Sequence, residues 1–413
     1  MFKNYLLTAY KVFMRRKLFT AINLLCIVLT LVVLMVVTAM LENAFYPSGV
    51  EGKSNRFLQV MPVRMESLDK TRTSTSPLGY RIIDKYLKPL KSVELVSAVT
   101  ITSTVAVYQE GRVTELQMRR ADANYWRILD FTLLAGRLTT ADDDDKGRFV
   151  IVINQSSARK LFGQADAVGK TISVSGQKFE VVGVVKDELH INAFSDLWAP
   201  ITTFPSTEYR EQLSGEFTAL LLGKSPADLP LIQQEVQMVA KSVQASDPKA
   251  WGRVYFWADS KLDAIARTTI GDPDKENSGA GILLGTVAGV MLVFMMLPAL
   301  NLVNLNTGRI LERSSEIGVR KAFGATSAQL VFQLIIENVL LCLAGGIIGL
   351  LCAKGVLVWL EHSGLIPYMK IDMNFAVLCY GLLLTLVFGL LSGVLPAWKM
   401  SRLDPVHALK GAI

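Results

Sequence analysis

Four long apolar runs constrain the fold of this chain more than any other feature of its sequence. They cover residues 18–41, 280–303, 339–360 and 375–395. Each has about 20 residues or more, which is the length that an α-helix needs to cross a bilayer core of roughly 30 Å. The first run is too long for the apolar core of a cleaved signal peptide, and no small-x-small cleavage site follows it. The sequence therefore predicts an α-helical membrane protein with four transmembrane helices, the first of them an uncleaved signal-anchor.

Charged residues beside these runs predict the orientation. Residues 1–17 contain five lysines or arginines and no acidic residue. The loop after the second run and the C-terminal tail also carry more basic than acidic residues. Because cytoplasmic segments are enriched in lysine and arginine, we expect both termini and this loop in the cytoplasm. The same partition accounts for the net charge of +7 without a nucleic-acid partner.

These spans divide the whole chain. The expected cytoplasmic parts are residues 1–17, a coupling loop and helix at 304–329, and a tail at 396–413. The expected spans are 18–41, 280–303, 330–360 (with the helix that enters the membrane) and 375–395. The expected external parts are a large domain at 42–278 and a short loop at 361–374. The cysteines all fall within the spans, so no disulfide framework is expected in the external domain: Cys26, Cys342, Cys352 and Cys379.

The external segment is long enough to fold around a core of its own. Alternating apolar residues predict hairpins that turn at residues 110–111 and 175–176, and the run at 148–154 is typical of a buried strand. Helices are expected at 155–162, ended by Gly163, and at 229–243. These patterns predict an α+β domain between the first and second membrane helices.

The sequence of the loop at 304–329 predicts a helix, a turn and the start of a second helix. Residues 306–321 can form a helix in which Glu316 and Arg320 pair at i, i+4. Gly324 is expected to end it, and Thr326 and Gln329 to cap the next helix. A solvated positive-inside loop would explain the arginines. It would not explain the apolar residues spread among them, which indicate a surface for a docked partner: Ile317, Val319, Ala322 and Phe323.

Glycines recur at every fourth position within three of the spans. This spacing lets two helix backbones approach closely where lipid provides no hydrophobic drive, although glycine is also common in spans in general. The spans lack a clear set of polar residues for a conduit. We therefore predict close helix packing, within the chain or in a dimer, at Gly281, Gly285, Gly289, Gly345, Gly349, Gly389 and Gly393.

Several motifs do not predict a chemical site. Five residues separate Gly163 from Gly169, whereas the phosphate-binding loop needs four. The four aspartates at 142–145 lack the spacing of a calcium loop and are expected in an exposed loop. The three histidines lie far apart without zinc-ligand spacing. The sequence therefore predicts no catalytic residue, no metal site and no cofactor in this chain, which is not expected to be an enzyme.

Residues 316–322 (EIGVRKA), followed by 324–326 (GAT), closely resemble the cytoplasmic loop of the FtsX-like/MacB-like permease family. That family is the membrane half of ABC systems typified by the macrolide exporter and the lipoprotein-release complex. The external segment resembles the periplasmic core of that family through four motifs in the same order: FTLLAGR at 131–137, VIVIN at 150–154, ARKLFG at 158–163 and VGKT at 168–171. The segment at 395–409 resembles the cytoplasmic tail of that family. By this resemblance an inserted subdomain would span roughly residues 120–215.

The resemblance implies a permease subunit of the bacterial inner membrane that dimerises with itself or a sister permease on two ABC ATPase subunits. Only 17 residues precede the first span, so the ATPase, with its ATP and Mg²⁺, is expected on a separate chain. Closure of the ATPases would push the loop and move the external domain, with Gly324 setting the bend. The residues expected to form this coupling site are Arg309, Glu312, Arg313, Glu316, Ile317, Gly318, Arg320, Lys321 and Gly324.

The implied activity is export of a peptide, antibiotic or lipid-linked substrate by mechanotransmission. A periplasmic adaptor, an outer-membrane factor and membrane lipids are the further partners that this implies. The alternative keeps the fold but makes the chain a regulator that transmits the ATP state to a cell-wall hydrolase or a peptide-sensing partner. A membrane-tethered enzyme is a weaker alternative because no catalytic constellation is present.

Overall fold

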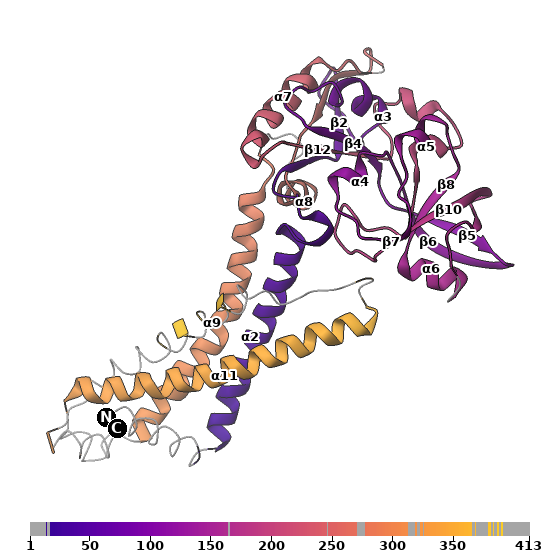
Figure 1. Cartoon of the computed structure of the whole chain (residues 1–413). Helices are drawn as coiled ribbons and strands as arrows, with labels where there is room; N and C mark the ends of the chain where they lie inside the picture. The colour runs from indigo at the N-terminus through magenta and orange to yellow at the C-terminus, as the bar shows by residue number, and fades with distance from the viewer. Residues whose placement is uncertain are drawn as a thin grey trace. The chain divides into compact units, whose positions relative to one another are not determined.

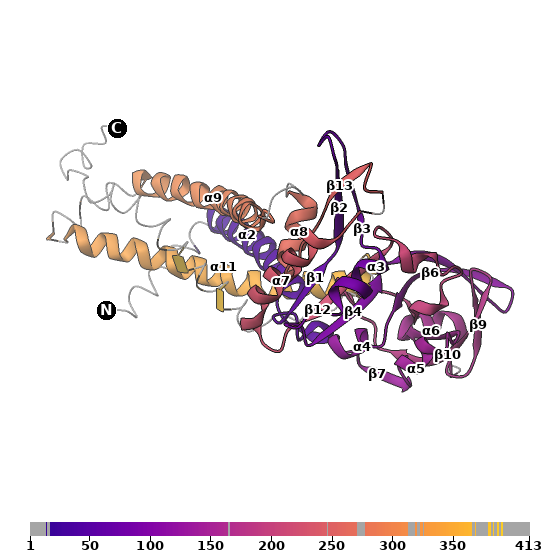
Figure 2. The same ribbon diagram turned by 90° about the horizontal axis from the view of Figure 1, so that it is seen from above.

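The computed structural model of the protein describes residues 14, 17–163, 166–245, 247–270, 277–312, 319, 323–324, 326–365, 368, 379–380, 383, 386–387 and 390. The chain divides into two compact units. We name Asn43–Leu283 the core domain, and we name the remainder, Met1–Glu42 with Leu284–Ile413, the helical unit. Figure 1 labels their elements, and Figure 2 shows them from above.

Three long helices make up most of the described helical unit: α2 (Lys17–Phe45), α9 (Ala280–Glu312) and α11 (Ser327–Ser363). Two of them contain stretches long and apolar enough to cross a membrane, Thr20–Phe45 and Val331–Ser363. A shorter apolar helical stretch runs over Ala280–Met296. The fourth expected span, at 375–395, lies mostly outside the described residues, so the total of four spans stays a prediction.

The core domain is an α+β fold, as its sequence pattern predicts. Its strands are β1 (Phe57–Val60), β2 (Pro62–Ser67), β3 (Thr73–Pro77), β4 (Leu95–Thr100), β5 (Ser103–Gln109), β6 (Arg112–Ala121), β7 (Leu133–Gly136), β8 (Val150–Asn154), β9 (Thr171–Val174), β10 (Gln177–Val185), β11 (Leu197–Pro200), β12 (Phe217–Leu222) and β13 (Trp251–Phe256). Its helices are α3 (Tyr80–Ile82), α4 (Tyr125–Ile128), α5 (Ala141–Asp145), α6 (Gln155–Phe162), α7 (Leu229–Ser242) and α8 (Lys261–Thr269). Shorter helical turns are η1 (Gly49–Glu51), η2 (Ile83–Leu87), η3 (Ile201–Thr203), η4 (Glu208–Glu211) and η5 (Pro226–Asp228).

One mixed sheet runs through the core domain in the order β1-β12-β4-β6-β11-β8-β10-β9-β5, with β7 beside β10. Most neighbours are antiparallel, but β10 pairs in parallel with β8, and β11 pairs in parallel with β6. A second sheet has the order β13-β2-β3. The core domain has two lobes, one around β2, β12 and α7 and the other around β8, β10 and α6 (Figures 1 and 2). The segment 120–215 supplies β7 to β11, and the hairpin β5–β6 joins them from outside that range.

Local signals explain several of these elements. The Asn154 side chain accepts a hydrogen bond from the N–H of Ser157 (2.8 Å) and so caps α6. Gly163 ends the same helix at a φ of +66°, which glycine tolerates without strain. The two predicted hairpins turn at residues 110–111 and 175–176, and all four of these residues have positive φ. These predictions are confirmed.

Three clusters of buried apolar side chains fill the core domain. One lies beneath α7 and includes Ile232 and Val236. The second surrounds Trp126 and Trp198, whose ring centroids are 5.9 Å apart. The third lies beneath α6 and extends to β8 and β10. Burial of this apolar surface is the main force that holds the two lobes in one domain.

The loop predicted at residues 142–145 is wrong, because these residues form most of α5, although Asp142 and Asp145 are exposed as expected. The N–H of Thr140 donates to the Asp143 carboxylate (2.9 Å), and the N–H of Asp143 donates to Thr140 Oγ1 (3.4 Å). This reciprocal pair is a capping box, which satisfies two N–H groups at the start of the helix. Asp143 is consequently buried rather than solvated.

Candidate coupling site

A tight turn leads into α11. Gly324 has a φ of +90°, a conformation that favours glycine. The helix then begins with the predicted capping box, in which the N–H of Gln329 donates to Thr326 Oγ1 (3.3 Å) and the N–H of Thr326 donates to Gln329 Oε1 (3.1 Å). This capping prediction is confirmed. Phe323 is 87% exposed and Val319 is 44% exposed, so the turn presents apolar surface.

Most of the residues predicted to contact an ATPase are not described. By their backbone, Arg309 and Glu312 belong to the last turn of α9. The structure does not describe the others between α9 and the turn: Arg313, Glu316, Ile317, Gly318, Arg320 and Lys321. Their role stays a prediction.

Two glycines of α11 lie against α2. A Cβ atom built at Gly345 would lie 2.7 Å from Ile27 Cγ2, and one at Gly349 would lie 3.2 Å from Leu31 Cβ. Ile27 and Leu31 are buried together with Leu341 of α11. The contact advances by four residues on both helices at once, so α2 and α11 cross while pointing in the same general direction. The chain therefore enters both helices from the same end.

The remaining predicted packing glycines differ. In the described chain no heavy atom lies within 4 Å of a Cβ built at Gly281, Gly285 or Gly289. Gly389 and Gly393 fall outside the described residues. Within one copy, the structure therefore shows a close helix contact only at the α11 pair among the glycines it describes.

Three polar side chains are buried in these apolar helices, which the sequence pattern misses. Asn23 lies one turn before Ile27 on the stripe of α2 that faces α11, and Glu337 and Asn338 lie one turn before the contact residues of α11. The Gln333 amide donates to the Glu337 carboxylate (3.0 Å). Buried polar groups in membrane helices are costly and mark functional positions more often than apolar ones do.

Buried polar contacts hold η1, the helical turn that follows α2, within the core domain. Glu51, in η1, is fully buried, and its Oε2 lies 2.5 Å from Nζ of Lys261, which is 4% exposed. This contact is an ion pair without the alignment of a hydrogen bond. The other carboxylate oxygen of Glu51 accepts a hydrogen bond from the N–H of Asn192 (2.8 Å). Lys261 is the first residue of α8, the last described helix before α9.

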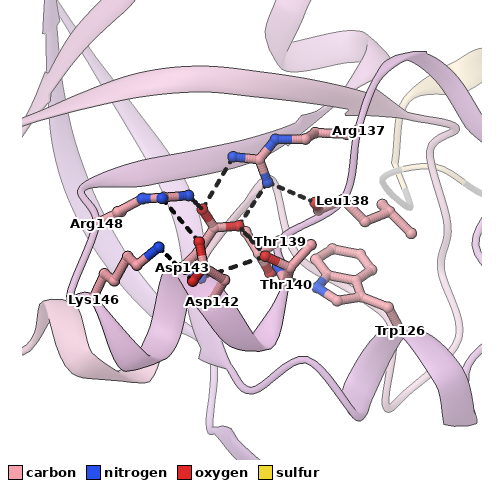
Figure 3. Close-up of polar contacts among 9 residues, drawn as sticks. All are labelled: Trp126, Arg137, Leu138, Thr139, Thr140, Asp142, Asp143, Lys146 and Arg148. Atoms are coloured by element: carbon pink, nitrogen blue, oxygen red, sulfur yellow. Dashed lines mark hydrogen bonds and ion pairs between the residues drawn. The ribbon is translucent and has the colours of Figure 1, made fainter.

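A second charged cluster holds α5 in the other lobe (Figure 3). Arg137 donates two hydrogen bonds to the Asp143 carboxylate (2.6 and 3.0 Å), and Arg148 donates one (3.2 Å). Thr140 Oγ1 donates a further one (2.8 Å). Burial opposes ionisation of this carboxyl group, but these donors outweigh it and hold the pKa of Asp143 well below its usual range.

Close packing of β7 on β10 explains why the FTLLAGR segment at 131–137 has a glycine before its arginine. Gly136 has a φ of +71°, and a Cβ there would overlap the carbonyl oxygen of Val182 in β10. A Cβ at Gly183 would overlap the carbonyl oxygen of Arg137 in the same way. The two glycines thus let β7 approach β10 closely, which places Arg137 against Asp143.

In the described residues no group of three histidine, cysteine, aspartate or glutamate side chains could hold a metal ion. Sequence patterns did not predict the Glu51–Lys261 pair, because the two residues are more than two hundred positions apart in the chain.

Two protein families match most of the chain. The MacB-like periplasmic core domain matches residues 20–239, which is more than half of the sequence. The FtsX-like permease C-terminal region matches residues 288–405.

Two curated proteins and one solved structure illustrate what the chain is similar to. The uncharacterized ABC transporter permease YknZ of Bacillus subtilis (strain 168) is 26% identical over 328 residues, which are 79% of this chain and 77% of the relative. The macrolide export ATP-binding/permease protein MacB of Chromobacterium violaceum is 28% identical over 312 residues, which are 73% of this chain and 46% of the relative. The chain thus spans most of the first relative and less than half of the second. The solved periplasmic region of MacB from Actinobacillus actinomycetemcomitans is 15% identical and covers 54% of this chain and 98% of that region, with a TM-score of 0.38.

Proposed function

This chain belongs to the MacB-like and FtsX-like family of ABC transporter permeases, and we propose that it transmits the state of an ATPase to its core domain through its membrane helices. In this proposal the chain itself catalyses no reaction. ATP and Mg²⁺ bind to the ATPase, and the permease converts its closure into movement on the far side of the membrane. Such coupling requires a stiff element with two arrangements, each favoured by one state of the ATPase.

One observation carries the proposal: a turn with apolar surface is joined to a capped helix that packs closely on α2. Phe323 and Val319 are exposed at the turn, and α11 begins three residues after Gly324. Gly345 of α11 lies against Ile27 of α2, and α2 continues directly into the core domain. A displacement of the turn can therefore pass from α11 to α2 and along the chain to the core domain.

The proposed site of ATPase contact is the turn with the segment before it. Apolar residues at its surface would be buried by a docked subunit, and the arginines there would pair with acidic groups of that subunit. We propose that the ATPase is a separate chain. The name of YknZ, of which this chain spans 77%, describes a permease alone, whereas that of MacB describes an ATP-binding protein as well.

A dimer is part of the proposal. Gly281, Gly285 and Gly289 form a small-residue stripe with open space around it in one copy. A second permease copy or a sister permease could pack there, since small residues allow helix backbones to approach. The proposed location is the bacterial inner membrane, with both termini in the cytoplasm, because the basic residues gather in the segments expected on that side.

Export is the proposed outcome of the movement. The relative from Chromobacterium violaceum is named a macrolide export protein, and this chain matches it over 73% of its own length. A peptide, an antibiotic or a lipid-linked molecule is the proposed class of substrate. A periplasmic adaptor and an outer-membrane factor would complete such a route.

A double substitution in the turn segment tests the proposed ATPase contact. Glu316→Ala with Arg320→Ala should lower the amount of ABC ATPase that co-purifies in detergent by about tenfold, because the charged contacts of this segment with the docked subunit are lost. Mass spectrometry of the purified complex identifies and quantifies the ATPase. ATP hydrolysis by the remaining complex should no longer respond to the permease.

The matched control removes an exposed i, i+4 pair of the core domain. Asp142 and Lys146 form such a pair at 2.7 Å, and Asp142→Ala with Lys146→Ala should leave ATPase binding unchanged. Equal ATPase recovery with the turn variant and the wild type would contradict the proposed contact.

A further inference from the structure

Two segments join the core domain to the helical unit, one after α2 and one before α9, and they contact each other within the core domain. The first connection follows α2 and forms η1 at Gly49–Glu51. The second is α8 with Ser278, which lies two residues before the start of α9 at Ala280. More than two hundred residues separate them in sequence. The Glu51–Lys261 ion pair joins them directly.

The pair is buried on both sides. Glu51 is 0% exposed and Lys261 is 4% exposed, and the charged atoms are 2.5 Å apart. Desolvation of two charges costs about as much as their attraction returns, so a buried ion pair contributes little net stability. Removal of one partner, or separation of the two, would leave an uncompensated buried charge and is strongly unfavourable. The Glu51–Lys261 pair therefore adds little to the free energy of unfolding, but it resists any movement of η1 away from α8.

The second connection is fastened to α8. Ser260 Oγ and Ser278 Oγ both donate to the carboxylate of Asp263, each at 2.5 Å. Asp263 lies in the first turn of α8, next to Lys261. The segment that leads into α9 is thereby tied to the helix that carries the buried lysine.

The first connection is held from its other side. Ser48 Oγ lies 3.2 Å from Nε2 of His190, and the Asn192 N–H donates to Glu51. Gly49 has a φ of +50°, and a Cβ there would lie 3.0 Å from the His190 ring. η1 therefore sits between α8 and the β10–β11 connection and has little room to shift alone.

We propose that the Glu51–Lys261 ion pair is a joint that makes the chain leaving α2 and the chain entering α9 move as one body with the core domain. The inference rests on the proposed function, since it assigns the place where helix movement enters the domain. Without the joint, α2 and α9 could shift relative to each other without moving the domain. Glu51 and Lys261 are positioning residues in this account and touch no substrate.

The core domain contains a matched control pair. Asp259 and Arg267 are also buried, and Arg267 donates two hydrogen bonds to Asp259 (2.7 and 3.0 Å). These residues lie eight positions apart in the α8 segment, so their ion pair does not connect it to η1. Neutralising this pair removes the same kind of buried charge without opening the proposed joint.

The first measurement is amide hydrogen exchange on the full-length protein in detergent. Glu51→Gln with Lys261→Met should speed amide exchange in residues 48–52 by about tenfold, because local opening no longer separates buried charges. Asp259→Asn with Arg267→Met should leave exchange in residues 48–52 as in the wild type. Unchanged exchange in the Glu51→Gln with Lys261→Met variant would contradict the proposal that this ion pair holds η1 against α8.

The second measurement uses the complex with its ATPase, with and without ATP and vanadate. The nucleotide-dependent change in exchange within the core domain should fall at least about fivefold in Glu51→Gln with Lys261→Met, while ATPase binding persists. The control pair should retain the response even if both variants lose similar thermal stability. Equal loss in both variants, or a normal response in the first, would refute the inference.

The two measurements also separate this inference from the proposed function. A wild-type permease that binds no ATPase, or shows no nucleotide-dependent change, contradicts the proposed function. The exchange rates of residues 48–52 in the permease alone still support or refute the proposed role of the ion pair in that case.

Discussion

Asp143 and Asp144 are neighbours in a run of four aspartates, yet their surroundings shift the pKa values of their carboxyl groups in opposite directions. Donors from Arg137, Thr140 and Arg148 hold the pKa of Asp143 below its usual range despite its burial. Burial, together with the nearby charge of Asp122, raises the pKa of Asp144 to about 7. The N–H of Ile201 donates to Asp144 at 3.1 Å. The sequence could not predict this contrast, because the partners of both carboxyl groups come from distant segments.

The raised pKa of Asp144 predicts a pH-dependent stability. The folded protein keeps this proton up to about pH 7, whereas the unfolded chain releases it near the ordinary pKa of 3.8. The favourable contribution is therefore complete below about pH 4 and is lost as the pH rises through 7. Asp144→Asn should remove this loss and stabilise the core domain at pH 8 relative to pH 4 by about 2 kcal/mol, after allowance for solvent at the half-buried carboxyl group.

Thermal unfolding of the full-length protein, followed by tryptophan fluorescence at pH 4 to 8, measures the effect. Asp145→Asn replaces an exposed neighbour and should leave the pH profile unchanged. A parallel shift of both variants at every pH would argue against a proton held by Asp144.

At the scale of elements, the sequence predicts where the long helices lie along the chain but not which of their faces are in contact. The apolar runs and the Thr326 capping box locate α2 and α11, because these signals are local. The four-residue spacing of glycines marks three candidate faces equally well, and the structure describes two of them. The structure places Gly345 and Gly349 in contact with α2 and leaves the α9 glycines open in one copy. Which face is covered depends on tertiary packing, and no local pattern encodes that choice.

The contact at Gly345 predicts a steric effect of one methyl group. Gly345→Ala would place its Cβ 2.7 Å from Ile27 Cγ2, so α2 and α11 must move apart. Overpacking of this kind costs about 1–3 kcal/mol, so the midpoint of thermal unfolding in detergent should fall. Added Ile27→Ala should recover part of the loss by making room for the methyl group.

Gly355 of the same helix provides the control, since nothing lies within 4 Å of a Cβ built there. Gly355→Ala should be neutral or slightly stabilising, because alanine has the higher helix propensity. An equal fall for both alanine variants would show that the α2–α11 contact does not set the stability.

At the scale of the whole molecule, the order of domains could be read from the sequence, whereas the strand order could not. The α+β composition and most hairpins follow from local alternation and turn residues. The pairing of β5 with β9, and of β12 with β4, joins segments far apart in sequence. Such pairings are set by the packing of the whole domain. For the same reason the Glu51–Lys261 contact could not be predicted from either segment.

The shared direction of α2 and α11 bears on the proposed membrane topology. If both helices span the membrane, the start of α2 at Lys17 and the turn at Gly324 are expected in the same compartment. An alkaline phosphatase fusion at position 200 should be active, and a green fluorescent protein fusion at position 315 should be fluorescent. These reporters work only outside and only inside the cytoplasm, respectively. Fusions of both reporters at each position complete the test, and the same compartment for 200 and 315 would contradict the topology.

The fastening of η1 to α8 also bears on how such permeases diversify. A domain whose two ends are bound to each other occupies the chain as a single insertion would, however large it grows. Lobes can then be enlarged, lost or exchanged between relatives without altering the pair of helices that carries them.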